Sequence, residues 1–162
     1  MNRNLGSGFF LAAAVCALAC ATAAHASDQQ QQLRIQRVVD GLRAKLSITQ
    51  PVIVTMVQTN PSLFSVAPPT GRDGTFLLAV EEDFAQELSD AEIEAAVAHE
   101  LGHVWIFTHF PYLQTEELAN EIAARVVSPE RLAPLYAKVW ARTRKSEAEV
   151  AHQQTGEFRS LP

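Results

Sequence analysis

Apolar positions in the first half of the chain follow two different repeats. From Asp28 to Leu46 they recur every three or four residues, which predicts an amphipathic helix. From Pro51 to Thr59 β-branched residues dominate between two prolines, which predicts a strand. Leu63 to Val66 predicts a short second strand, and Thr75 to Val80 predicts a third. The turn-forming residues between these last two strands favour their pairing as a hairpin.

A long helical pattern follows the third strand. Ser89 and Glu92 have the spacing of a capping box, in which each side chain hydrogen-bonds the backbone of the other residue. Apolar residues then recur at helical spacing as far as His109. Pro111 ends the pattern, because proline disfavours helical backbone at the residue before it. We therefore expect one uninterrupted helix from Asp90 to His109.

Two more helices are predicted after this one. Thr115 to Val127 has helical spacing, and Ser128-Pro129 has the form of an N-cap followed by a first-turn proline. The last helix is expected to reach about His152. Strands followed by helices indicate an α+β fold. We expect a small, mostly antiparallel sheet packed on the helix that ends at His109 and on the helix after it, with flanking helices.

The first 26 residues differ in composition from the rest. One arginine precedes an alanine-rich apolar run, and Ala24-His25-Ala26 has the small-x-small pattern of a signal peptidase site. Phe9 to Ala24 is shorter than the roughly 20 apolar residues of a membrane-spanning helix. We expect residues 1–26 to be a signal peptide, and residues 27–162 to be one periplasmic or secreted domain without membrane contact. A lipoprotein anchored at Cys20 is the alternative.

Composition narrows the possible partners. Both cysteines, Cys16 and Cys20, lie in the leader, so the mature domain is expected to have no disulfide. The whole chain has a formal net charge of −5, and the leader contributes one arginine and no acid. This acidity argues against nucleic acid as a partner. We expect the glutamine run from Gln29 to Gln32 to be a solvated lead-in.

Candidate chemistry begins at His99-Glu100-Leu101-Gly102-His103, which matches the pattern H-E-x-x-H. At about 100° per residue, positions i and i+4 differ by about 40° around a helix and about 6 Å along it, so both imidazoles reach one point. Two such nitrogens suit Zn²⁺, with the glutamate facing the open coordination position. Two partly buried histidines without a metal are the alternative. The place of the motif inside a capped helix favours the metal.

A catalytic zinc site needs a third protein ligand. His109 stands where a longer histidine pattern would place its last ligand, but Ile106 occupies the position at which that pattern needs a helix-breaking glycine. If the helix continues, His109 lies about 9 Å beyond His103 and about 120° off its face, so we do not choose it. The other source is a carboxylate from the next helix, and the choices in order of preference are Glu116, Glu117 and Glu121.

The residues around Glu116 favour a close approach of the two helices. Ala119 is small, and Gly102 equally lets a neighbouring element come close. Asn120 could hydrogen-bond the nitrogen of a ligand histidine that does not bind the metal. The plainer interpretation of Glu116 and Glu117 is that first-turn acids complement a helix dipole.

The same region resembles known zinc peptidases. The segment up to the second histidine, LSDAEIEAAVAHELGH, resembles that of HtpX-like and prenyl-protease-type peptidases, which are gluzincins. The segment TEELANEIAARVVSPERL is similar to the glutamate-bearing stretch of the ImmA-type peptidases. The resemblance covers about residues 60–132 and indicates a minigluzincin, although Asn120 replaces an aspartate of the HtpX-like pattern. It implies that Glu100 is the general base. The zinc ligands that it implies are His99, His103 and Glu116.

The resemblance also implies where a peptide or protein substrate would bind. In such peptidases the strand before the active-site helix lies at a sheet edge beside the metal, so Thr75 to Val80 could pair with an extended peptide. An ordinary protected edge strand or an interior strand is the alternative. Peptide hydrolysis forms an intermediate with a negatively charged oxygen, the oxyanion, which needs a hydrogen-bond donor from a further side chain. The choices left open for this donor are His109, Tyr112, Arg131, Tyr136 and His152. The aromatic residues expected in the core or lining a groove are Trp105, Phe107, Tyr136 and Trp140.

Three functions follow from these observations. The first is an exported zinc metalloendopeptidase that cleaves peptide bonds with Glu100 as general base. The second is a latent or non-catalytic zinc-containing binding or regulatory protein, kept inactive by a partner or by its own tail from Gly156 to Pro162. The third is hydrolysis of a non-protein amide such as a cell-wall peptide. A zinc ion reachable by water would favour an enzyme.

Overall fold

The computed structural model describes the backbone of residues 8–71 and 73–157, and the side chains of residues 27–71 and 73–145. The fold is α+β, as the sequence predicts. The signal-peptide prediction for residues 1–26 concerns side chains outside the described residues. The elements in chain order are α1 (Gly8–Lys45), β1 (Val52–Val57), β2 (Phe64–Ala67), β3 (Phe76–Glu81), α2 (Glu82–Glu87), α3 (Asp90–His109), α4 (Glu116–Ala123) and α5 (Pro129–Glu157).

The three strands form a sheet in the order β1-β3-β2. The predicted hairpin of β2 and β3 is confirmed, because these strands pair antiparallel. β1 and β3 pair parallel, so the sheet is mixed rather than mostly antiparallel. After β1 the chain crosses to β2, and β3 returns between the two. The sequence pattern identifies strands but not their neighbours, which depend on this long-range pairing.

This order corrects the expected place of Thr75 to Val80. The corresponding strand β3 is central, with Leu78 paired to Val54 on one side and to Val66 on the other. Its main chain is therefore bonded to both neighbours. A peptide cannot be added along it as it could along an edge strand.

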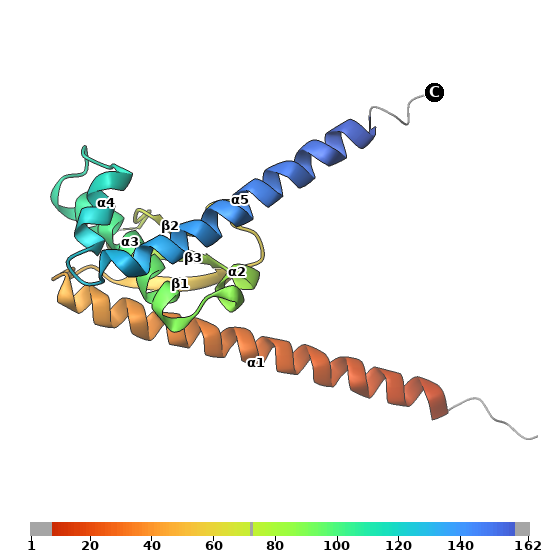
Figure 1. Ribbon diagram of the computed structural model, residues 1–162. Helices are drawn as coiled ribbons and strands as arrows, with labels where there is room; N and C mark the ends of the chain where they lie inside the picture. Colours follow the sequence, from red (N-terminus) through yellow and green to blue (C-terminus); the bar gives the residue numbers. More distant parts are fainter. Residues whose placement is uncertain (1–7, 72, 158–162) are drawn as a thin grey trace, which may run out of the picture.

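Helix α1 runs alongside β1 and also contacts α3, whereas α4 and α5 lie farther from α1 (Figure 1). Gln36 accepts a hydrogen bond from the Val54 amide at 2.9 Å and donates one to the Val52 carbonyl at 3.0 Å. Gln32 donates to the Val54 carbonyl at 2.8 Å. These amides occupy the outer edge of β1 in place of another strand. Gln31 also bonds the Ala85 carbonyl, so the glutamine run is not simply a solvated lead-in.

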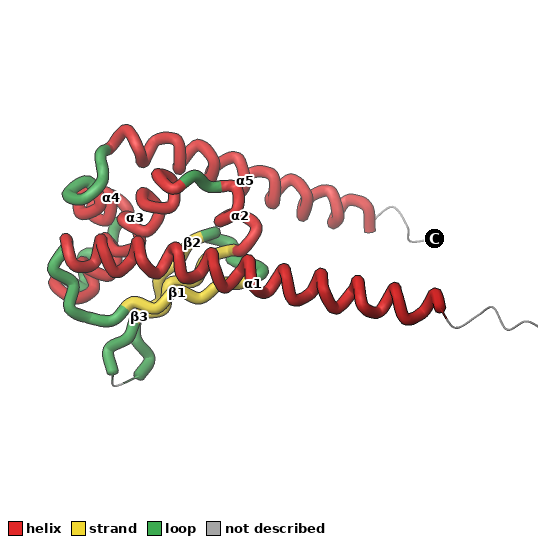
Figure 2. The backbone as a smooth tube through the Cα atoms, turned by 90° about the horizontal axis from the view of Figure 1, so that it is seen from below, coloured by secondary structure: helices red, strands yellow, loops and turns green. Residues whose placement is uncertain are grey.

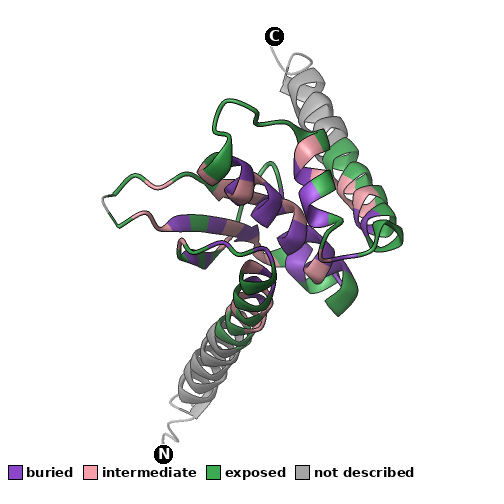
Figure 3. Cartoon of the chain, turned by 90° about the vertical axis from the view of Figure 1, so that its left-hand side faces the viewer, coloured by how far each residue is buried: buried purple, intermediate pink, exposed green. Residues whose placement is uncertain are grey.

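Buried residues concentrate in the sheet and in α3, which crosses the middle of the molecule (Figure 3). The predicted capping box is present at its start, with the Ser89 side chain accepting from the Glu92 amide and the Glu92 side chain from the Ser89 amide. The helix ends at His109, before Pro111, as the sequence predicts. It therefore forms a rigid, buried support for the histidines of the H-E-x-x-H motif.

Helix α5 lies against α3 and is tied to it by two ion pairs. Arg131 contacts Glu94 at 2.5 Å, and Lys138 contacts Glu92 at 2.8 Å. Tyr136 lies between these anchors in the sequence, so the pairs hold it at a fixed place over α3. The tube view shows α5 and α1 as the two long helices that flank the shorter elements (Figure 2). Within the described part of the chain, no helix is long and apolar enough to cross a membrane.

Candidate metal centre

Helix α3 presents His99 and His103 on one face. Their Nε2 atoms lie 3.2 Å apart, and the ring centroids lie 4.9 Å apart in an edge-to-face arrangement. This is the local geometry that positions i and i+4 of a helix produce. Both side chains are partly buried, with 12% and 19% of their surfaces exposed. The two rings therefore face one point at the wall of a cavity.

Helix α4 brings Glu116 to the same point. Its Oε2 lies 3.1 Å from His99 Nε2, and its Oε1 lies 3.5 Å from His103 Nε2. Among the described residues, these three form the group whose ligand atoms could hold a metal ion. Glu117 and Glu121 are exposed and do not belong to it.

This donor set fits a Zn²⁺ ion. Bonds of about 2.0–2.1 Å from a tetrahedral zinc place neighbouring ligand atoms about 3.3 Å apart. The separations between His99, His103 and Glu116 are 3.1, 3.2 and 3.5 Å. Two imidazoles and one carboxylate also leave a fourth position for water, as catalytic zinc sites do.

The packing of α4 on α3 places Glu116. A Cβ atom at Gly102 would lie within 3.0 Å of the Ala119 backbone, so the two helices touch where both residues are small. The sequence expectation for Gly102 and Ala119 is confirmed. Thr115 caps α4 by accepting a hydrogen bond from the Leu118 amide at 3.1 Å. This cap fixes the first turn of the helix, where Glu116 lies.

Asn120 orients His99 through the ring nitrogen that faces away from Glu116 and His103. Its Oδ1 lies 2.8 Å from His99 Nδ1, and a carbonyl oxygen can only accept a hydrogen bond. His99 therefore carries its proton on Nδ1, which leaves the Nε2 lone pair directed at Glu116 and His103. The hydroxyl of Tyr136 donates to the same oxygen. Such partners fix the tautomer and ring orientation of metal-binding histidines.

Gln114 does the same for His103, a role that sequence reasoning missed. Its Oε1 lies 3.3 Å from His103 Nδ1, and its Nε2 donates to the His103 carbonyl oxygen at 3.2 Å. The second bond settles which end of the amide faces the ring, so Nδ1 of His103 is the protonated nitrogen. No motif marks Gln114, because it lies in the loop after α3. Its only sequence signal is its place two residues before Glu116.

Glu100 lies beside the three potential ligands without joining them. Only 8% of its surface is exposed. Burial raises the pKa of the Glu100 carboxyl, while the nearby His99 and His103 act in the opposite direction. The carboxyl also accepts a hydrogen bond from the backbone amide of Val66 in β2. Glu100 thus sits between the metal-binding group and the outer strand of the sheet.

The residues considered for the oxyanion have different surroundings. Tyr136 lines the same cavity as His99, and burial together with the negative charge of Glu116 raises the pKa of its hydroxyl. His109 stacks on Trp105 at 4.1 Å and contacts the Trp105 carbonyl. Two others do not line the cavity: Tyr112 is 98% exposed, and Arg131 is paired with Glu94. The His152 side chain lies outside the described residues.

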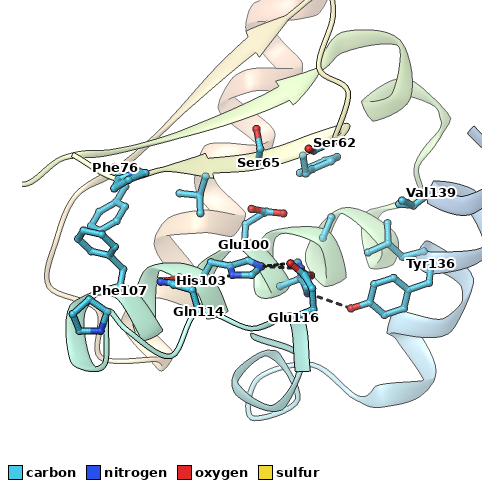
Figure 4. A pocket seen from close by; sticks show the side chains of 17 residues that line it. Ser62, Ser65, Phe76, Glu100, His103, Phe107, Gln114, Glu116, Tyr136 and Val139 are labelled. Atoms are coloured by element: carbon cyan, nitrogen blue, oxygen red, sulfur yellow. Dashed lines mark hydrogen bonds and ion pairs between the residues drawn. The ribbon is translucent and has the colours of Figure 1, made fainter. Parts of the chain in front are cut away.

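A cavity of about 590 Å³ contains the metal-binding group (Figure 4). Its lining includes β2, through Phe64, Ser65 and Val66, and the long helices α3 and α5. Of the aromatic residues expected at a groove, Phe107 and Tyr136 line it. Trp105 is partly buried against the core, and Trp140 is 67% exposed, so the expectation for Trp140 is wrong. Apolar surface with a few convergent polar groups is typical of a ligand site.

Comparisons with known proteins add little to this geometry. No protein-family model matches the chain, and no curated protein matches it. A solved structure, that of the metallopeptidase zymogen of Pyrococcus abyssi abylysin, is similar at 16% sequence identity. The similarity covers 68% of this chain and 95% of that chain, with a TM-score of 0.49. A TM-score below 0.5 does not establish a common fold, so the site is interpreted from its own contacts.

Proposed function

We propose that this protein is an exported, zinc-dependent metalloendopeptidase. The observation that carries the proposal is the convergence of His99, His103 and Glu116 at tetrahedral spacing, with the buried carboxyl of Glu100 beside them in one cavity. A metal-binding group without a neighbouring base would suit a structural role equally well. A carboxyl with a raised pKa next to an open coordination position suits hydrolysis.

His99, His103 and Glu116 would hold the ion. When bound, Zn²⁺ supplies a Lewis acid that polarises the scissile carbonyl group and makes water more acidic. Glu100 takes one proton from the attacking water on a carboxylate oxygen and later gives that proton to the leaving amine nitrogen. Water's oxygen forms the new bond to the carbonyl carbon, and the carbon–nitrogen bond breaks. Asn120 and Gln114 keep the two imidazoles oriented throughout.

Tyr136 is the donor that we assign to the developing oxyanion. Its hydroxyl lies 3.2 Å from His99 Nδ1 and Tyr136 lines the cavity, whereas His109, Tyr112 and Arg131 do not line it. In this structure the hydroxyl donates to Asn120. A rotation of the hydroxyl would direct the same proton toward a substrate oxygen in the cavity.

The substrate is proposed to be an extended peptide that pairs with β2 rather than with β3. The outer edge of β1 is occupied by Gln32 and Gln36, and β3 is central. β2 borders the cavity and pairs with β3 on one side. A peptide added along the other side would replace the contact of Glu100 with the Val66 amide and would lie beside the metal-binding group.

Replacing Glu100 with Gln tests the mechanism. The purified wild type should hold about one zinc ion and cleave unstructured peptides, and Glu100→Gln should keep the metal and lose the cleavage. Equal cleavage by both proteins would exclude Glu100 as the base. A wild type that binds zinc and peptides but cleaves nothing would favour the latent or regulatory protein instead.

A further inference from the structure

One end of the cavity is apolar and well defined. Phe76 and Phe107 contact each other edge to face, with ring centroids 5.4 Å apart and planes at 84°. Pro111 also lines the cavity. Phe76 is buried at 2% exposure, whereas Phe107 is 37% exposed. Phe76 therefore backs the ring of Phe107, which is the part of this wall that a ligand can reach.

The metal-binding group separates this end from the opposite end of the cavity. Figure 4 shows Phe76 and Phe107 at one side, Tyr136 and Val139 at the other, and His103 between them. The two ends have different chemistry, because the Tyr136 end also carries the hydroxyl groups of Tyr136 and Ser62. An extended chain lying across the metal-binding group would thus place residues on both sides of it.

The direction of β2 indicates which part of a peptide would reach the aromatic end. Ala67, at the C-terminal end of β2, pairs with Leu77, the neighbour of Phe76 in β3. Phe64, at the other end, pairs with Val80. Antiparallel pairing is somewhat more stable per residue than parallel pairing. A peptide antiparallel to β2 would therefore place its N-terminal half at the Phe76 and Phe107 end.

We propose that Phe107, supported by Phe76, forms a subsite for an apolar side chain on the N-terminal side of the scissile bond. The inference rests on the proposed function and names a substrate class, namely unfolded or extended polypeptide segments with an aromatic or large aliphatic residue there. Burying such a side chain against an apolar wall favours it over a small or charged one. Differences of this kind change kcat/KM by roughly ten- to a hundred-fold.

The test compares cleavage-site profiles on a library of proteome-derived peptides. Wild type should prefer Phe, Leu, Ile or Met at one position N-terminal to the cut. Phe107→Ala should lower kcat/KM for these peptides roughly ten-fold or more and flatten the preference. Phe107→Lys should shift the preference toward Asp and Glu. Phe110→Ala is the matched control, because Phe110 is 51% exposed, lies in the same segment and does not line the cavity.

Three cleavage results would overturn the proposal. One is cleavage without an apolar preference, and another is a preference that Phe107→Ala leaves unchanged. The third is a Phe107-dependent preference on the C-terminal side of the cut, which would contradict the antiparallel arrangement. In each of these cases Glu100→Gln still abolishes cleavage if the proposed function is correct.

Binding separates this inference from the catalytic proposal. Zinc-loaded Glu100→Gln is titrated with fluorescein-labelled peptides of Gly, Ser and Thr that contain one Phe, Leu, Asp or Gly at a central position. Tighter binding of the Phe and Leu peptides, lost when Phe107→Ala is added, supports the subsite even if the wild type cleaves nothing. Equal binding of all four peptides, or no binding, overturns the subsite whatever the catalytic result.

Discussion

Gly102 of α3 and Ala119 of α4 pack so closely that a Cβ atom at Gly102 would meet the Ala119 backbone within 3.0 Å. Gly102 adjoins His103, and Ala119 adjoins Asn120, which bonds His99. The contact therefore sets the distance between the helix that carries the histidines and the helix that carries Glu116. Backbone, unlike a flexible side-chain end, cannot give way cheaply at this point.

Gly102→Ala is expected to push the two helices apart. Overpacking of this kind costs typically about 1–3 kcal/mol of unfolding free energy. Zinc affinity should fall at the same time, because Glu116 moves away from the histidines. Urea unfolding and zinc competition with a chromophoric chelator measure the two effects. Gly41→Ala is the control, since a Cβ at Gly41 in α1 meets nothing within 4 Å; it should leave zinc binding unchanged and raise stability by about 0.5–1 kcal/mol.

Glu116→Gln should weaken zinc binding by well over ten-fold. The substitution removes the anionic ligand and keeps the shape of the side chain, so the fold should persist because Glu116 is 78% exposed at its side chain. Glu117→Gln has the same chemistry one residue later and should bind zinc like the wild type. A loss of affinity in Glu117→Gln or in His109→Ala instead would show that the third ligand is assigned wrongly. Chelator competition at pH 7 distinguishes these results.

Gln114→Ala should lower zinc affinity by about ten- to a hundred-fold, the usual effect of removing a group that orients a ligand histidine. The His103 ring would lose the acceptor that holds its proton on Nδ1. Unfolding of the metal-free protein should change little, because Gln114 is exposed. Leu113→Ala, in the same loop and 54% exposed, is the control. Equal zinc affinities for both variants would contradict the orienting role.

Glu92 should make stability depend on pH in the acid range. Its hydrogen bond from Lys138, aided by bonds from Ser89, lowers the pKa of this buried carboxyl from 4.5 to about 2. Because the pKa is lowered on folding, the contribution is complete above about pH 4.5 and is lost as the pH falls through about 2. Glu92→Gln should cost roughly 1–3 kcal/mol at pH 7.

The pH series tests the sign of that effect. Wild type and Glu92→Gln should converge in urea-unfolding free energy as the pH falls from 5 toward 2, whereas wild type and the exposed Glu121→Gln should differ little at any pH. A gap between wild type and Glu92→Gln that stays constant with pH would mean that the Glu92 carboxylate is not the source. Lys138→Met should reproduce the loss at pH 7, because it removes the main donor.

Local sequence determined the bounds of helix α3 and the spacing of its histidines. The capping box at Ser89 and Glu92 and the proline at Pro111 act within one turn of the helix ends, so both ends were predictable. The approach of His99 to His103 is likewise a property of one helix. The small residues at Gly102 and Ala119 indicate a close contact between two helices. The helix ends and the histidine spacing depend on residues that are near one another in the chain.

Tertiary structure decided what surrounds that helix. β3 is central because it returns between β1 and β2, a pairing that no local pattern specifies. The glutamines of α1 cover the edge of β1, and Gln114 meets His103, through contacts that depend on packing between elements. Phe76 and Phe107 come from a strand and a helix and meet at the cavity in the same way. Periodicity reports how each segment folds, whereas the partners of a side chain depend on how the segments pack together.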